Sequence, residues 1–98
     1  MARPPVYSRQ AEADIRHVFR HSLQLFGPRQ ARGYSDRIRR ACEDLAAGVA
    51  KGQAIDRIRA GYLRKLVGSH YVIYRFDDGG RLLVVRILHS RMDLPDHL

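Results

Sequence analysis

The sequence has one cysteine, no tryptophan and no apolar run that approaches the ~20 residues of a membrane-spanning helix. The single cysteine, Cys42, excludes an internal disulfide, and its place among apolar helix positions favours a buried small side chain over a nucleophile. Residues 1–30 lack the basic start, apolar run and small-residue cleavage site of a signal peptide. We therefore expect a cytoplasmic protein without membrane contact.

Acidic residues and lysines are also few. Aspartate and glutamate number 10 against 18 basic residues, for a net charge of +8, and Lys51 and Lys65 are the only lysines. Arginine is suited to planar, bidentate contacts with phosphate or carboxylate. The excess of arginine is consistent with a solvated basic surface and equally with an acidic partner, either a protein or a nucleic acid.

The first half of the chain predicts a short edge strand followed by a helical hairpin. Residues 5–8 fit the strand, and Ser8 is placed to cap a helix that begins at Arg9. Gly27-Pro28 ends this helix, and a second one follows over residues 28–47. The positions at helical spacing that predict the inward faces are Ala11, Ile15, Val18, Phe19, Ser22, Leu25 and Phe26, then Ala31, Tyr34, Ile38, Ala41, Cys42 and Leu45.

The second half predicts a small antiparallel sheet. Residues 48–60 read as a loop with room for one helical turn, and residues 61–68, 70–76 and 81–88 read as strands. Residues 77–80 (DDGG) predict a tight hairpin, because aspartate and glycine accept the positive φ of such turns. The expected fold is a single α+β domain over residues 1–98, with the helical hairpin packed on one face of the sheet.

The last strand, residues 81–88, is apolar at both alternating sets of positions. Leu83, Val85 and Ile87 fall on one side, and Leu82, Val84 and Leu88 fall on the other. A helical hairpin covers one face of a sheet, so the second face needs another cover. Three candidates remain open: the loop from Gln53 to Ala60, the C-terminal tail, or a helix or strand of a partner.

No metal, cofactor or nucleophile site is expected. His17 and His21 have the spacing of a zinc-binding HExxH helix, but Val18 stands where the glutamate is required. The tail residues His89, Asp93, Asp96 and His97 lack an evident set of supporting hydrogen-bond partners.

General acid–base cleavage of RNA is the remaining enzymatic option, since it needs cations and a proton carrier but no metal. Side chains that could supply cations at one end of the sheet are Arg64, Lys65, Arg75, Arg86, His89 and Arg91. The alternative is that these strand side chains simply face water.

Three stretches resemble the ParE toxins of bacterial ParDE toxin–antitoxin systems. Residues 88–93 (LHSRMD) are similar to the signature that closes the family's last strand, and residues 61–75 (GYLRKLVGSHYVIYR) match the pattern that precedes it. The first helix carries the family's A-x-x-D-I at Ala11, Asp14 and Ile15. The resemblance covers essentially the whole chain.

This resemblance implies a toxin that is not an enzyme. It implies binding to DNA gyrase, stabilisation of the cleaved gyrase–DNA complex, and neutralisation by a ParD-type antitoxin with a ribbon-helix-helix domain. No direct sequence-specific DNA binding is expected from the toxin alone. We assign target binding to His89, Arg91, Met92 and Asp93, and antitoxin binding to Ile15, Phe19, Leu82, Val84 and Leu88.

The alternative function comes from the RelE branch of the same superfamily, whose members are ribosome-dependent mRNA endonucleases. On that interpretation the catalytic residues are Arg64, Arg86 and His89. The tail after Arg91 has no tyrosine, which that branch usually places near the C-terminus, so we favour inhibition by binding.

Overall fold

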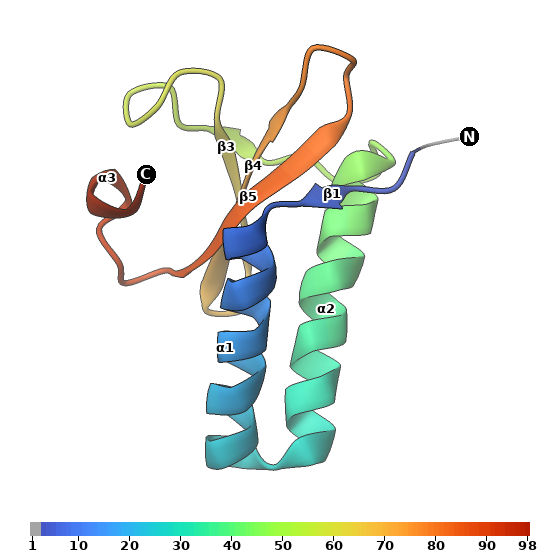
Figure 1. The fold of residues 1–98 in the computed structure, drawn as a ribbon, viewed down its shortest axis with the longest axis vertical. Coiled ribbons are helices and arrows are strands. Elements are labelled where there is room, and N and C mark those ends of the chain that lie inside the picture. The colour runs from blue at the N-terminus through green and yellow to red at the C-terminus, as the bar shows by residue number, and fades with distance from the viewer. Residues whose placement is uncertain (1–2) are drawn as a thin grey trace.

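The computed structural model describes residues 3–98 and has a helical hairpin packed on a five-stranded sheet (Figure 1). The elements in chain order are β1 (Val6–Tyr7), α1 (Arg9–Phe26), α2 (Pro28–Ala46), β2 (Gln53–Ala54), β3 (Leu63–Val67), β4 (His70–Phe76), β5 (Leu82–His89) and α3 (Leu94–His97). The α+β fold class is therefore confirmed. None of the helices in the described part of the chain is both long and apolar enough to cross a membrane.

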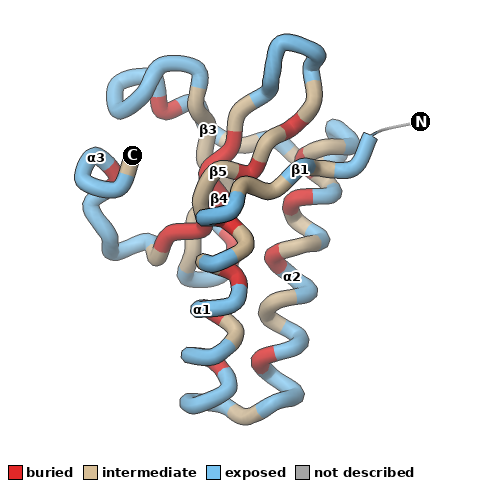
Figure 2. Tube along the Cα trace, viewed as in Figure 1, coloured by how far each residue is buried: buried red, intermediate tan, exposed pale blue. Residues whose placement is uncertain are grey.

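The two long helices begin and end where the sequence predicts. The Ser8 hydroxyl oxygen accepts a hydrogen bond from the Ala11 N–H at 3.0 Å, which caps α1. Gly27 joins α1 to α2 with a φ of 87°, a conformation that glycine adopts without strain. The buried positions lie on the facing sides of the helices and on the strands above them, and the hairpin end extends beyond the sheet into solvent (Figure 2).

The sheet has the strand order β1-β5-β4-β3-β2, and its pairings are antiparallel except for one. The three predicted strands β3, β4 and β5 pair antiparallel as expected, and the N-terminal edge strand β1 is present and pairs with β5 in parallel. The whole of α1, α2 and the hairpin strands intervenes between β1 and β5, and a connection of this length allows parallel pairing. The short strand β2 and the short helix α3 were not predicted.

An extra residue in β5 changes which of its side chains face the helices. The pairing runs regularly from Phe76–Leu82 to Tyr74–Val84 and then resumes at Ile73–Arg86, which leaves Val85 unpaired as a β-bulge. Beyond the bulge the alternation shifts by one position. Ile87 therefore joins Leu82 and Val84 in the core beneath the helices, contrary to the regular alternation predicted from sequence.

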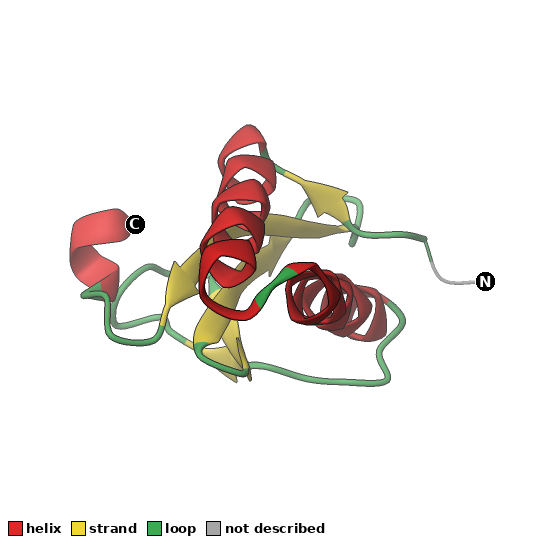
Figure 3. Ribbon diagram, turned by 90° about the horizontal axis from the view of Figure 1, so that it is seen from below, coloured by secondary structure: helices red, strands yellow, loops and turns green. Residues whose placement is uncertain are grey.

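The second face of the sheet is covered by the protein itself. Leu88, beyond the bulge, is 1% exposed in a smaller core on this face with Ile73 from β4. Ile55 from the loop and Leu94 from α3 close this core. Figure 3 shows α3 lying apart from the two long helices. Of the three covers left open by the sequence, the loop and the tail act together, and this core needs no partner.

The carboxylate of Asp14 fixes α1 to β5 next to the bulge. It accepts hydrogen bonds from Arg86 Nε at 2.8 Å, Arg86 Nη2 at 3.2 Å and the Ile87 N–H at 2.9 Å. The two side chains are 18% and 20% exposed, so water screens the pair weakly, and the hydrogen bond to Asp14 raises the pKa of Arg86. The A-x-x-D-I sequence thus joins the two layers of the fold.

Removal of this carboxylate should destabilise the protein markedly. In Asp14→Ala, the Arg86 guanidinium and the Ile87 N–H lose their acceptor. We therefore expect the free energy of unfolding, measured with urea, to fall by about 2–3 kcal/mol. Glu12→Ala is the control, because the Glu12–Arg39 pair is 37% and 41% exposed and should contribute at most about 1 kcal/mol. Equal losses in the two variants would contradict a special role for Asp14.

Candidate functional site

A groove of about 630 Å³ lies between the outer half of the helical hairpin and the end of the sheet. We call it the histidine groove. Its lining residues are His21, Ser22, Leu25, Phe26, Gln30, Gly33, Tyr34, Arg37, Gly68, Ser69, His70 and His89. No carboxylate is among them, so its electrostatic character is set by arginine and histidine.

Tyr34 on α2 ties the β3–β4 turn to the helical hairpin. Its hydroxyl lies 3.0 Å from the Val67 carbonyl, 3.0 Å from the Ser69 N–H and 2.6 Å from His70 Nδ1. A tyrosine hydroxyl donates one hydrogen bond and accepts two, so all three contacts are satisfied when His70 carries its proton on Nδ1. Gly68 leaves room for the ring, since a β-carbon there would lie 2.6 Å from Tyr34 and its φ is +59°.

His70 and His89 face each other across β4 and β5. Their ring centroids are 5.1 Å apart in an edge-on arrangement, and His89 Nδ1 accepts a hydrogen bond from the Arg91 N–H at 3.1 Å. Burial, with the neighbouring His89 and His21, lowers the pKa of His70 to about 4. His70 is therefore neutral near pH 7. The bond from Arg91 to His89 Nδ1 selects the His89 tautomer that carries its proton on Nε2.

The β-bulge creates this histidine pair. If the register at Phe76–Leu82 continued without the extra residue, Leu88 would stand opposite His70, whereas the observed partner is His89. Sequence reasoning missed the groove for this reason, and because Tyr34 and His21 were assigned to the helix faces alone. In the sequence, nothing about His70 and Tyr71 at the start of the strand distinguishes a groove residue from an ordinary strand residue.

Cys42 and the possible metal ligands add no chemistry that this site uses. Cys42 is buried, and burial raises the pKa of its thiol to about 11, so the reactive thiolate is scarce. Across residues 3–98, no three histidine, cysteine or acidic side chains gather closely enough to hold a metal ion.

Comparison with known proteins identifies the family. Residues 6–94 match the family model described as the ParE toxin of the type II toxin-antitoxin system, parDE. Toxin ParE1 of Caulobacter vibrioides is 36% identical over 96 residues, which cover 98% of each chain. The chain belongs to the ParE toxin family.

Two solved structures share the fold of this ParE-family toxin. A chromosomal ParDE toxin–antitoxin system from P. aeruginosa superposes with a TM-score of 0.77 at 20% identity, over 90% of this chain and 96% of the other. The RelBE2 toxin–antitoxin complex from Mycobacterium tuberculosis gives a TM-score of 0.62 at 20% identity, over 91% and 92%. The expected RelE/ParE-like fold is thereby confirmed.

The residues predicted for RNA cleavage have separate contacts in the toxin. Arg86 is bound by Asp14, and Arg64 lies over the Tyr71 ring at 4.5 Å and contacts the Gln53 side chain. His89 instead pairs with His70 in the histidine groove. Arg64 and Arg86 flank Ile73 as its two cross-strand partners, whereas His89 lies at the end of β5 beside His70.

The residues predicted for antitoxin binding are mostly inside the toxin. Ile15, Leu82, Val84 and Leu88 are between 0% and 4% exposed in the toxin's own two cores. The expectation that these four present a surface is wrong: Ile15, Leu82 and Val84 pack between the helices and the sheet, and Leu88 is covered by the loop and by α3. Phe19 is partly exposed and lines a groove between the two helices.

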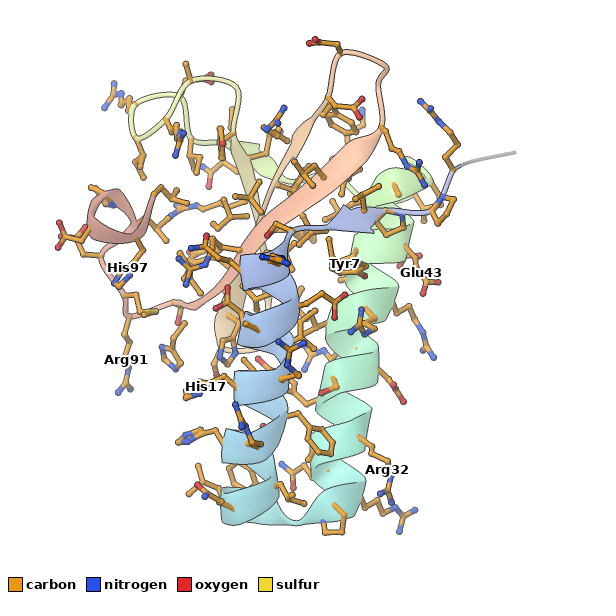
Figure 4. All side chains as sticks on the ribbon, viewed as in Figure 1. Tyr7, His17, Arg32, Glu43, Arg91 and His97 are labelled. Atoms are coloured by element: carbon orange, nitrogen blue, oxygen red, sulfur yellow. The ribbon has the colours of Figure 1, made fainter. Side chains whose placement is uncertain are left out.

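The residues predicted for target binding follow β5 as a turn. The Met92 N–H donates to the His89 carbonyl at 2.9 Å, and Arg91, Met92 and Asp93 are exposed. Figure 4 shows the Arg91 side chain pointing away from the ribbon. We call His89, Arg91, Met92 and Asp93 the C-terminal patch; its role in target binding stays a prediction.

The lowered pKa of His70 predicts a pH-dependent stability. The imidazole of His70 takes up a proton near pH 6.5 in the unfolded chain and near pH 4 in the folded chain. The free energy of unfolding therefore keeps its full value above about pH 6.5 and falls as the pH drops from there toward pH 4. We expect a loss of up to about 3 kcal/mol between about pH 7 and about pH 4.

Urea unfolding of two asparagine variants checks this expectation. His70→Asn keeps a polar group near Tyr34 but cannot titrate, so it should reduce the pH dependence. The exposed His17→Asn on α1 is the control and should leave the dependence as in the parent. An unchanged slope in His70→Asn would mean that other groups cause the effect.

Proposed function

We propose that this toxin inhibits DNA gyrase by binding and stabilising the cleaved gyrase–DNA complex, and that a ParD-type antitoxin neutralises it. Membership of the ParE family over residues 6–94 carries this proposal. The exposed C-terminal patch supports it, because Arg91, Met92 and Asp93 offer a cation, a flexible apolar side chain and an anion at one turn. Binding at such a surface requires no catalytic group.

Ribosome-dependent cleavage of mRNA is the alternative function. The fold shared with the RelBE2 complex and the His70–His89 pair favour it. The contacts of Arg86 weigh against it, since a guanidinium engaged by Asp14 would have to leave that partner to stabilise a phosphorane. Cleavage of ribosome-bound message with gyrase unaffected would establish this alternative.

Charge reversal in the C-terminal patch should weaken gyrase inhibition. Arg91→Glu replaces an exposed cation with an anion, and we expect at least a tenfold higher toxin concentration for half-inhibition of supercoiling. Accumulation of cleaved DNA should fall in parallel. The measurement is a supercoiling assay with purified gyrase, followed by detection of linear DNA.

Arg57→Glu is the matched control for this assay. Arg57 is exposed in the loop before β3 and carries the same charge change, so it should inhibit gyrase as the parent does. Equal loss in both variants would indicate a general effect of net charge and would reject the C-terminal patch as the contact. No inhibition by the parent would reject gyrase as the target.

For the antitoxin, the favoured surface is the groove of about 380 Å³ between α1 and α2, which we call the arginine groove. It is lined by Ile15, Arg16, Phe19, Arg20, Ser35 and Arg39. Phe19 supplies apolar surface, while Arg16 and Arg20 flank it as exposed cations. An acidic, amphipathic helix fits this combination, and both solved structures described above are of toxin–antitoxin systems.

Reversing two charges of the arginine groove tests this surface. The double variant Arg16→Glu, Arg20→Glu should bind the cognate antitoxin at least a hundredfold more weakly, because two attractive contacts become repulsive. Arg29→Glu with Arg32→Glu on α2 is the control, since these exposed arginines lie outside the groove. Calorimetric titration measures both, and equal weakening would exclude the arginine groove as the specific site.

A further inference from the structure

The histidine groove has no assigned role apart from His89, which it shares with the C-terminal patch. Its volume of about 630 Å³ is within the range of small-molecule sites, roughly 300–1,000 Å³. Arg37 and His21 enter it from the helices without an opposing carboxylate in the lining. The field within the groove therefore favours an anion.

The same groove offers a flat apolar surface. Phe26 and Leu25 at the end of α1 are each 59% exposed, which is high for side chains of this size, and Tyr34 forms part of the wall. The preferred ligand thus combines a negative charge with an apolar, planar group, since Phe26 can stack with it.

His70 adds a requirement for a hydrogen-bond donor. With Nδ1 bonded to Tyr34 and the ring neutral, its Nε2 is an acceptor on a groove otherwise rich in donors. A helix of an acidic protein would supply carboxylates and apolar side chains, but its backbone N–H groups are already bonded. A nucleotide has all three features, because it carries a phosphate, a planar base and amino or hydroxyl donors.

We infer that the histidine groove binds a nucleotide, with the phosphate at Arg37 and His21, the base against Phe26, and a donor of the base or sugar at His70. The ligand is either free or one unit of a single strand. The contacts to phosphate and base face carry no sequence code, which agrees with the expected lack of sequence-specific DNA binding. The inference concerns the toxin alone and does not depend on gyrase as its target.

Binding of a short fluorescent oligodeoxyadenylate to the full-length toxin, followed by anisotropy, tests this inference. Arg37→Gln should weaken binding about tenfold and reduce the slope of log affinity against log salt by about one, as loss of one phosphate contact requires. Phe26→Leu keeps an apolar side chain but removes the aromatic face, and should also cost about tenfold. Both side chains are exposed, and thermal melting verifies that the variants fold.

Arg32→Gln is the matched control. It removes the same charge from the same helix, and its side chain projects from the outer side of α2 rather than lining the groove (Figure 4). It should change the affinity by no more than about twofold. Equal effects of the Arg32 and Arg37 variants would overturn the inference, because binding would then follow net charge alone.

Two competitors identify the source of the ligand. Displacement of the oligonucleotide by deoxyadenosine monophosphate indicates that a free nucleotide suffices, whereas binding of the strand alone, with the same dependence on Arg37, indicates a strand ligand. Polyglutamate of matched charge should displace neither the oligonucleotide nor the mononucleotide. Efficient displacement by polyglutamate, or no binding of either nucleotide form, would reject the nucleotide and leave an acidic peptide as the occupant or the groove empty. Gyrase inhibition is measured separately, so the two proposals fail independently.

Discussion

The fold of this toxin depends on the contact between the start of α1 and the bulge in β5. A bulge interrupts the ladder of a strand and leaves backbone groups to be satisfied elsewhere. Ser8 accounts for one side of it, since its N–H donates to the Val84 carbonyl at 2.9 Å and its hydroxyl to the Val85 carbonyl at 2.7 Å. Asp14 accounts for the other side through the Ile87 N–H and Arg86. A helix end that is already capped by Ser8 therefore also stabilises the irregular strand, and the two layers cannot shift relative to each other without losing these bonds.

Asp14 is one of four acidic side chains that are engaged within the molecule. Asp14 and Glu12 are engaged with arginines, Asp77 Oδ1 accepts hydrogen bonds from the Gly79 and Arg81 N–H groups, and Asp56 Oδ1 accepts one from the Gly61 N–H. These four acidic side chains thus serve ion pairs and turns within the molecule. Exposed arginines without such partners set the field outside it, which favours anionic ligands on both sides of the hairpin.

Local signals were sufficient to predict the two long helices and the three main strands, but not the long-range geometry that joins them. The Ser8 cap, the helical spacing and the turn at Gly27 each act within a few residues, so the helices were predicted to within one residue. The bulge at Val85 has no local signature, because its stability comes from Ser8 and Asp14, more than seventy residues away. Its consequences could not be predicted either: Leu88 moves to the second core, and His89 comes opposite His70.

The two grooves impose a condition on neutralisation. Adjacent residues of α2, Tyr34 and Ser35, line the histidine groove and the arginine groove respectively, so the grooves open on different sides of the hairpin. The C-terminal patch adjoins the histidine groove through His89. If the antitoxin filled the arginine groove alone, the patch would stay accessible to the target. If the C-terminal patch contacts the target and the arginine groove binds the antitoxin, as proposed, an antitoxin that neutralises by steric exclusion must continue past the hairpin to the histidine side. A segment too short to do so would then bind the toxin without inhibiting it.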